Sequence, residues 1–191
     1  MSDNPVSVFG TGRRQTFLVA LAVLLVDQLT KWLVVSNLPI GAEWAPIPWL
    51  ANSLVITHTT NTGAAFGLAP DAGWIFVVIA VFVILGIIFY YDKLPTDHWM
   101  VRVALGLLLG GSIGNLLDRL TRGSVVDFVD LRIWPIFNVA DSAIVVGVFI
   151  MFYYLLKEEK AIKARNAAAA TAAAQVDAPP TADGDETPSQ S

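Results

Sequence analysis

Most of the polar residues that could carry out chemistry lie in one stretch, residues 106–141. This stretch begins as an apolar, glycine-rich segment and then gains carboxylates, carboxamides and arginines. These side chains are Asn115, Asp118, Arg119, Arg122, Asp127, Asp130, Arg132, Asn138 and Asp141. Directly after Asp141 the chain becomes apolar again. Carboxylates at the ends of membrane-length segments are costly to keep there, so they indicate a functional site.

A close pair of carboxylates favours acid–base chemistry. Both groups cannot ionise cheaply, so the pKa of one rises and the pKa of the other falls. One Asp then takes a proton from a water, and the other protonates a carbonyl or a leaving amine, which is aspartyl peptide hydrolysis. Intramembrane Asp and Arg also serve in proton relays, so chemistry alone favours a proton-coupled transporter equally. A purely structural membrane protein is the third possibility.

The composition excludes several other kinds of site. The chain has no cysteine, so it forms no disulfide and no thiolate metal site. Its two histidines, His58 and His98, are far apart, so a metal site would consist mostly of carboxylates. We expect neither a metal nor a cofactor. The net charge of -4 comes from the last residues, and the balanced remainder indicates no nucleic-acid partner.

Four apolar segments must position the polar residues. Hydrophobic residues make up 55% of the chain and the mean hydropathy is +0.61, which is ordinary for a small multispanning membrane protein. We predict transmembrane helices over residues 16–35, 73–91, 99–117 and 138–156, each about as long as a bilayer core requires. The predicted fold class is therefore an all-α membrane protein with four spans.

Helical spacing predicts which polar groups share a face. Asp27 and Lys31 are four residues apart in the first span, where a structural ion pair is the alternative to a functional role. A row of glycines in the third span, Gly106, Gly110 and Gly114, would let another helix pack closely. This row continues into Asp118, so the tightly packed side of the helix becomes its polar side.

The segment of residues 36–72 is too long and varied to be a simple connector. It has no Lys or Arg, and β-branched residues at 53–60 indicate one or two short strands. We expect His58 to be a surface strand residue without a role. The motif NTGAAFG follows, with Asn61 and Gly63, and its small residues would allow another group to approach the backbone closely.

The basic residues predict the topology. With four spans, one side holds Arg13, Arg14, Lys93, Arg102, Lys157, Lys160, Lys163 and Arg165. The positive-inside rule places this side in the cytoplasm, together with both termini. The polar groups then converge at the extracytoplasmic face. We divide the chain into a cytoplasmic segment 1–15, a transmembrane domain 16–156 and a charged, alanine-rich tail 157–191, which is expected to be disordered or fraying beyond its charged start.

Five motifs occur in a characteristic order: DQLTK, NTGAAF, GGSIGNLLDR, VVDF and FNVAD. Together they span residues 27–141, and in this order they resemble the lipoprotein signal peptidase family, signal peptidase II. The combination of GNLLDR, VVDF and FNVAD is highly specific, whereas DQLTK alone is a weak signal. The resemblance omits both ends of the chain.

The resemblance implies an intramembrane aspartyl endopeptidase that removes the signal peptide of prolipoproteins before a diacylglyceryl-modified cysteine. Its catalytic pair corresponds to Asp127 and Asp141. The matching residues that line or support the site are Asn61, Gly63, Asn115, Asp118, Arg119, Asn138, Asp27 and Lys31. We expect Asp118 to brace Arg119, and Arg119 either to bind a substrate carbonyl or to form a structural pair with Asp118 or Asp127.

The resemblance also implies a small extracytoplasmic β-sheet between the first two helices and a location in the bacterial cytoplasmic (inner) membrane. The expected partners are diacylglyceryl-prolipoproteins and membrane lipid, and the cyclic peptide globomycin is the expected inhibitor. We expect a monomer.

Overall fold

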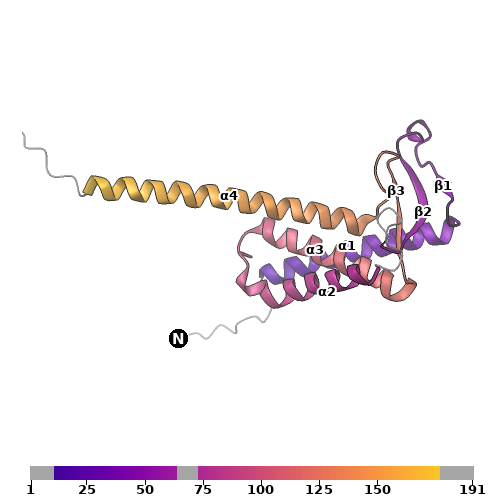
Figure 1. Cartoon of the computed structure of the whole chain (residues 1–191), viewed down its shortest axis with the longest axis horizontal. Coiled ribbons are helices and arrows are strands. Elements are labelled where there is room, and N and C mark those ends of the chain that lie inside the picture. The colour runs from indigo at the N-terminus through magenta and orange to yellow at the C-terminus, as the bar shows by residue number, and fades with distance from the viewer. Residues whose placement is uncertain (1–10, 64–72, 177–191) are drawn as a thin grey trace, which may run out of the picture. The chain divides into compact units, whose positions relative to one another are not determined.

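The computed structural model describes residues 11–63 and 73–176 of the chain. Within these residues, four long helices and three short strands form the fold (Figure 1). The elements are α1 (Thr11–Asn37), β1 (Glu43–Trp44), β2 (Val55–Asn61), α2 (Gly73–Tyr90), α3 (Trp99–Arg122), β3 (Val125–Asp130) and α4 (Val139–Val176), with short turns η1 (Pro48–Leu50) and η3 (Tyr91–Lys93). All four helices are long and apolar enough to cross a membrane. The predicted fold class is confirmed.

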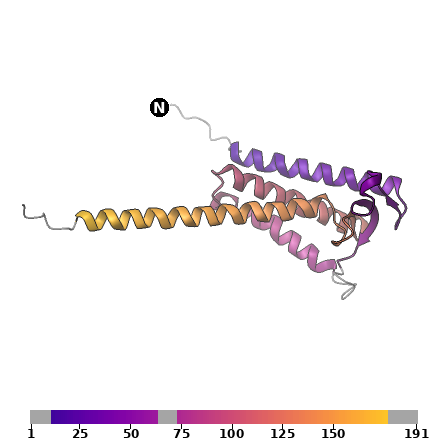
Figure 2. The same cartoon turned by 90° about the horizontal axis from the view of Figure 1, so that it is seen from above.

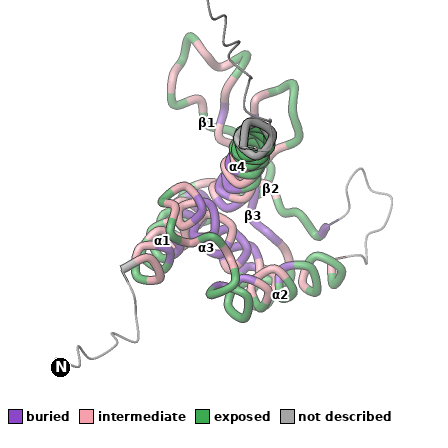
Figure 3. The backbone as a smooth tube through the Cα atoms, turned by 90° about the vertical axis from the view of Figure 1, so that its left-hand side faces the viewer, coloured by how far each residue is buried: buried purple, intermediate pink, exposed green. Residues whose placement is uncertain are grey.

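Helix α3 is the central helix, and it packs against both α1 and α2. In the most apolar 18-residue segment of α3, 56% of the residues are buried, whereas in the corresponding segment of α2 only 11% are buried. Figure 3 shows the same contrast along the backbone, with buried residues following α3 and exposed ones predominating on α2. The central position of α3 explains why this helix carries the polar cluster, since only a helix surrounded by protein can keep such groups away from lipid.

The glycine row lets α3 approach its neighbours closely, as predicted. A Cβ atom added at Gly106 would lie 2.6 Å from the Cβ of Val19, and one at Gly110 would lie 2.5 Å from the carbonyl oxygen of Ala20, both on α1. On the adjacent row, a Cβ at Gly111 would lie 2.5 Å from the carbonyl oxygen of Ala140 on α4. Small residues therefore bring α1 and the start of α4 against the same helix.

The three strands form an antiparallel sheet in the order β1-β2-β3, at the end of the helices where α1 and α3 finish (Figures 1 and 2). The sheet is not built from the segment between α1 and α2 alone, because β3 comes from the connection between α3 and α4. A two-stranded ribbon is only marginally stable, and pairing with β3 gives β2 a partner on each side. This pairing carries Asp127 into the sheet.

Two elements run further than predicted at their C-terminal ends. α3 continues to Arg122 and stops at Gly123, whose φ of 77° suits glycine and whose amide donates to the Arg119 carbonyl. α4 continues through the charged residues 157–165 to Val176, so the alanine run at residues 166–176, which was expected to be disordered or fraying, is helical. Alanine has the highest helix propensity, and Lys163 pairs with Glu159 one turn away, which favours the continuation. The compact unit of the fold ends at Tyr154.

One smaller expectation about the sheet is wrong. His58 is not a surface residue: it is buried, and its Nδ1 lies 2.7 Å from the carbonyl oxygen of Leu38. The histidine thereby ties β2 to the chain that leaves α1. The rest of the NTGAAFG motif after Gly63, the first ten residues and the tail beyond Val176 lie outside the described residues.

Candidate active site

Asp127 lies on β3 and is held by two carboxamides. Its Oδ1 accepts a hydrogen bond from Asn138 Nδ2 at 2.7 Å, and its Oδ2 accepts one from Asn61 Nδ2 at 2.9 Å. The side chain of Asn61 comes from β2, so the pairing of β2 with β3 positions the donor. Asp127 is only 2% exposed. Each of its oxygens therefore has a defined donor in place of water.

Asp141 lies in the first turn of α4. Its Oδ1 accepts from Asn115 Nδ2 of α3 at 2.7 Å, and its Oδ2 accepts from the backbone amide of Asn138 at 3.3 Å. In return, the Asp141 amide donates to Asn138 Oδ1 at 2.9 Å. This reciprocal arrangement is a capping box, with Asn138 immediately before the helix and Asp141 in the first turn. The same geometry that starts α4 thus fixes the carboxylate.

Asn138 and Asn115 join the two carboxylates into one network. Asn138 Nδ2 donates to Asn115 Oδ1 at 3.1 Å as well as to Asp127. Asn115 Oδ1 also accepts from Lys31 Nζ at 3.0 Å, which leaves its Nδ2 to face Asp141. The orientation of each amide is therefore determined by a neighbour, and Asp127 and Asp141 are held relative to each other through two uncharged side chains.

A fully buried group of charges lies behind this network. Lys31 Nζ is 2.9 Å from Asp27 Oδ2 and 2.8 Å from Asp118 Oδ2, and all three side chains are 0% exposed. Asp118 also pairs with Arg122 one turn along α3, at 2.7 Å. Two acids and two bases thus balance, as buried charges require. The predicted ion pair of Asp27 and Lys31 exists, and its lysine also holds Asn115.

The two acids of this group also anchor the elements that carry the site. Asp27 Oδ1 accepts from the backbone amide of Ala140 at the start of α4, at 2.9 Å. Asp118 Oδ2 accepts from the amide of Val126 on β3, at 3.3 Å. Each acid therefore fixes the backbone next to one of the two site aspartates, Asp141 and Asp127.

The expected role of Asp118 as a brace for Arg119 is wrong. Asp118 binds Lys31 of α1 and Arg122 of its own helix. Arg122 is four residues away and so lies on the same helix face as Asp118, whereas adjacent residues such as Asp118 and Arg119 do not face each other. Arg119 instead places its guanidinium 5.1 Å from the ring centre of Phe76 and donates to the Asn115 carbonyl at 3.4 Å. Among the described residues, its buried Nε has no hydrogen-bond partner. Arg119 therefore keeps a donor free for a ligand.

Gly63 determines how Asn61 faces the site. Its amide donates to Asn61 Oδ1 at 2.8 Å, which turns Asn61 Nδ2 toward Asp127. Gly63 has a φ of 96°, and an added Cβ would lie 2.9 Å from both the Cα of Gly73 and a ring carbon of Phe76. The prediction of a close backbone approach here is confirmed: the approaching group is the start of α2.

A cavity of about 380 Å³ opens beside these residues, between α2, α3 and α4. Its polar end includes Asn61, Asn115, Arg119 and Asp141, and its remaining walls are mostly apolar side chains such as Ile79. Asp127 adjoins the cavity through Asn61. Within the described ranges, no cluster of three or more His, Asp or Glu side chains is arranged to hold a metal ion. The arrangement suits a largely apolar ligand with one polar segment at the carboxylate end.

Burial raises the pKa of Asp127 to about 6. The hydrogen bond from Asn61 works in the opposite direction, the nearby charge of Asp141 raises the pKa further, and Asn138 and Lys31 lower it. Loss of water is thus the main cause, and the neighbouring carboxylate adds to it. Such a carboxyl group exchanges protons near neutral pH, as general acid–base chemistry requires.

The structure brings all ten predicted site residues into one connected region. Two residues that were not predicted to belong to the site also join this region. Gln28 Nε2 donates to Asp27 at 3.1 Å and to Asp118 and the Gly114 carbonyl at 3.3 Å each, and Arg122 pairs with Asp118. Gln28 follows Asp27 within the DQLTK motif, and Arg122 lies four residues after Asp118, so motif membership and helical spacing would have identified them.

Several known proteins are similar to this chain over most of its length. The family model of signal peptidase (SPase) II, Peptidase_A8, matches residues 19–157. The lipoprotein signal peptidase of Halalkalibacterium halodurans is 46% identical over 156 residues, which cover 79% of this chain and 98% of that protein. The lipoprotein signal peptidase of Bacillus subtilis is 43% identical over 144 residues, covering 73% and 92%. A solved bacterial membrane enzyme, 33% identical, superposes with a TM-score of 0.69 and covers 76% of this chain and 90% of its own.

The fold and these matches define a multi-pass bacterial membrane protein of the protease class. The chain belongs to the signal peptidase II family, the lipoprotein signal peptidases. It is therefore a membrane protease that removes signal peptides.

Proposed function

We propose that this chain is an aspartyl endopeptidase in which Asp127 and Asp141 activate the water that cleaves a prolipoprotein before its diacylglyceryl-modified cysteine. The observation that carries the proposal is the network in which Asn138 and Asn115 join the two carboxylates, one of which, Asp141, lines the cavity. Two carboxyl groups of unlike surroundings supply the acid and the base that peptide hydrolysis needs.

In the proposed reaction the ionised carboxylate takes a proton from water, and the water oxygen bonds to the scissile carbonyl carbon. The protonated carboxyl group gives its proton to the carbonyl oxygen and thereby stabilises the tetrahedral intermediate. The carbon–nitrogen bond then breaks, and a proton returns to the leaving amine. The products are a signal peptide with a new carboxyl terminus and a lipid-modified cysteine with a free amino group.

We assign the resting proton to Asp127. Its pKa of about 6 and its 2% exposure favour the uncharged form more than in an ordinary aspartate. Asp141 lines the cavity and is therefore better placed to face the attacking water. The pair titrates as a unit, so the assignment concerns the microstate in which attack begins.

The remaining site residues position the substrate. The free Nε of Arg119 and the polar edge formed by Asn61 and Gly63 are suited to binding the peptide backbone next to the scissile bond. The apolar walls of the cavity suit a signal-peptide side chain or part of the lipid. We place this end of the bundle at the extracytoplasmic face, where the lipid chains of the substrate hold the scissile bond, and both termini in the cytoplasm.

An assay of the purified chain on a diacylglyceryl-prolipoprotein, with and without globomycin, tests the proposal. Cleavage directly before the modified cysteine, blocked by globomycin and unaffected by chelators, is the expected result. Cleavage that requires a metal would contradict the aspartyl mechanism. Proton-coupled solute uptake in vesicles without cleavage would instead identify a transporter. Since one chain supplies every group of the site, a monomer should be active.

A further inference from the structure

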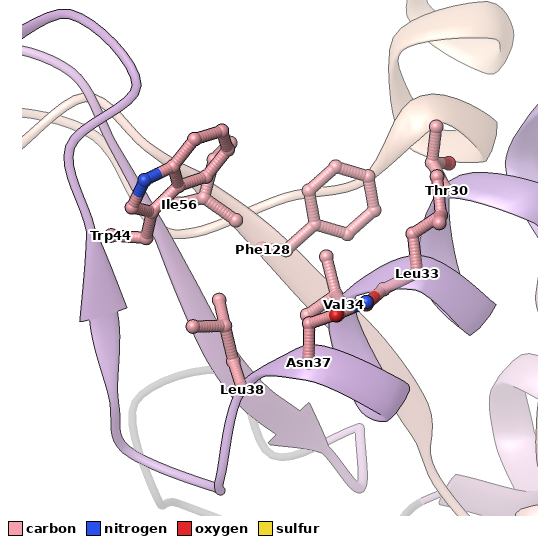
Figure 4. A pocket seen from close by; sticks show the side chains of 8 residues that line it. All are labelled: Thr30, Leu33, Val34, Asn37, Leu38, Trp44, Ile56 and Phe128. Carbon is pink, nitrogen blue, oxygen red and sulfur yellow. The ribbon is translucent and has the colours of Figure 1, made fainter.

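A second and larger hollow lies on the other side of the sheet from the candidate active site. It measures about 550 Å³ and is bounded by the last turns of α1, the chain that follows them, and one residue from each of the three strands (Figure 4). Trp44, Ile56 and Phe128 are these three, and Figure 4 shows them facing Leu38 and Val34 across the hollow. We call this hollow the α1 groove. It shares no lining residue with the active-site cavity.

The α1 groove is suited to an apolar occupant. Thr30 and Asn37 line the groove but donate within α1. Thr30 Oγ1 donates to the carbonyls of Val26 and Asp27 at 2.8 and 2.9 Å, and Asn37 Nδ2 donates to the Leu33 carbonyl at 2.8 Å. Among the described residues, no charged side chain lines the groove, and the remaining polar atom of a lining ring is the indole nitrogen of Trp44. An occupant with several hydrogen-bonding groups would therefore find few partners to replace its water, whereas a hydrocarbon needs none.

The groove is continuous with the surface of α1 that lipid must cover. Leu25, Leu29 and Leu33 are spaced by four residues, so they form one row along the helix, and they are 59%, 56% and 45% exposed. Leu33 and then Asn37, the next residue of the row, line the groove. A membrane-spanning helix presents such a row to acyl chains. An acyl chain that lies along the row therefore reaches the groove without crossing any polar surface.

We infer that the α1 groove binds an acyl chain of a membrane phospholipid. The occupant packs on Phe128, which adjoins Asp127 in β3 and faces the opposite side of the strand. The lipid thus supports the strand that carries one of the two site aspartates. The inference concerns a structural lipid, and it does not depend on the substrate or on the chemistry of the active site.

Photolabelling of the full chain tests this inference. The protein is placed in phospholipid nanodiscs that contain a phosphatidylglycerol with a diazirine in the middle of one acyl chain, and labelled residues are located by peptide mass spectrometry. We expect label on Ile56 in the groove as well as on the exposed Leu29. Leu38→Asp, which puts a charge into the groove, should lower labelling of Ile56 at least fivefold and leave Leu29 unchanged. Ile40→Asp is the matched control, because Ile40 is 72% exposed and lies outside the groove.

Asn37→Leu provides an independent variant that makes the groove more apolar, so labelling of Ile56 should increase. It decides the matter if Leu38→Asp fails to fold. Label on Leu29 without label on Ile56, or labelling of Ile56 that neither groove variant changes, would overturn the inference. So would displacement of the label by an equimolar diacylglyceryl peptide, which would assign the groove to the substrate.

Discussion

Asn115 and Asn138 share a hydrogen bond of 3.1 Å, and each also donates to a different aspartate. The distance between the two site carboxylates is therefore set by a pair of carboxamides that cannot change their charge. A carboxamide supplies an acceptor and two donors, so one residue can receive a bond from the scaffold and pass a donor to an acid. This arrangement determines what the substitutions below should do.

The first prediction concerns the two aspartates. Asp127→Asn and Asp141→Asn should each lower kcat by about three or more orders of magnitude, since each removes a group that must gain or lose a proton. The double variant should be little worse than either single one, because the pair acts as a unit. Asp130→Asn is the matched control on the same strand: its carboxylate binds Thr57 and Arg132 away from the pair. Cleavage within about tenfold of the parent rate by either site variant would refute the assignment.

The second prediction concerns pH. Since Asp127 is proposed to act from its protonated form, kcat/KM should fall as the pH rises through about 6. The hydrogen bond from Asn61 favours the ionised form of Asp127, so Asn61→Ala should raise the pKa of Asp127. The pH at which kcat/KM falls should therefore increase by about one unit. The exposed Asn52→Ala serves as control. If the fall in kcat/KM occurred at lower pH, or at an unchanged pH, in a folded Asn61→Ala protein, the proposed acid role of Asp127 would be contradicted.

The third prediction concerns the buried charges. Lys31→Met leaves Asp27 and Asp118 facing each other without their shared lysine, so it should destabilise the protein by about 3 to 5 kcal/mol. Adding Asp27→Asn should recover part of this loss, because it removes the carboxylate that is left without a cation, whereas Asp118 keeps its pair with Arg122. Thermal unfolding in detergent measures both effects. Lys163→Ala, which breaks an exposed pair with Glu159, should have no measurable effect on stability. If Lys31→Met and Lys163→Ala lowered the stability equally, the buried ion pairs would contribute no more than an exposed one, and the prediction would be wrong.

The fourth prediction separates backbone strain from close contact. Gly41 and Gly63 both have positive φ, 82° and 96°, but an added Cβ meets nothing within 4 Å at Gly41. Gly41→Ala should therefore cost only about 1 to 2 kcal/mol and leave the rate intact. Gly63→Ala should cost more and lower the rate as well, since it displaces the turn that orients Asn61. Thermal unfolding and a cleavage assay compare the two, and indistinguishable variants would argue against the contact with α2.

The fifth prediction concerns topology. Reporter fusions after Lys93 and after Lys157 should behave as cytoplasmic, and a fusion near Trp44 as external. The reason is that one side of the four spans carries Arg13, Arg14, Lys93, Arg102 and Lys157, whereas residues 36–72 between the first two spans contain no Lys or Arg. A cytoplasmic signal near Trp44 would place the carboxylates on the opposite face of the membrane from the one proposed.

The spans, the strand at residues 55–61 and the close contacts of the glycine row follow from the sequence because each depends on local composition and spacing. The partners of Asp118 did not follow, because Lys31 is a neighbour only after α1 packs on α3. The burial of His58 likewise depends on the chain that leaves α1. The pairing of β3 with β2 did not follow either, since it joins two connections that lie far apart in the sequence. Long-range packing, not local pattern, determined each of these features.

The buried charges have a consequence for how the chain enters the membrane. Asp27 and Lys31 lie four residues apart on α1, and Asp118 and Arg122 lie four apart on α3, so each helix brings its own opposite charges. Asp27 and Asp118 can therefore each leave the insertion machinery already paired with a base of the same helix, before the other helix has been synthesised. Neither acid has to wait in the lipid without a cation, which would be expensive there. Lys31 needs only to extend its existing pair to Asp118 when the helices meet, so biogenesis and the final architecture use the same four side chains.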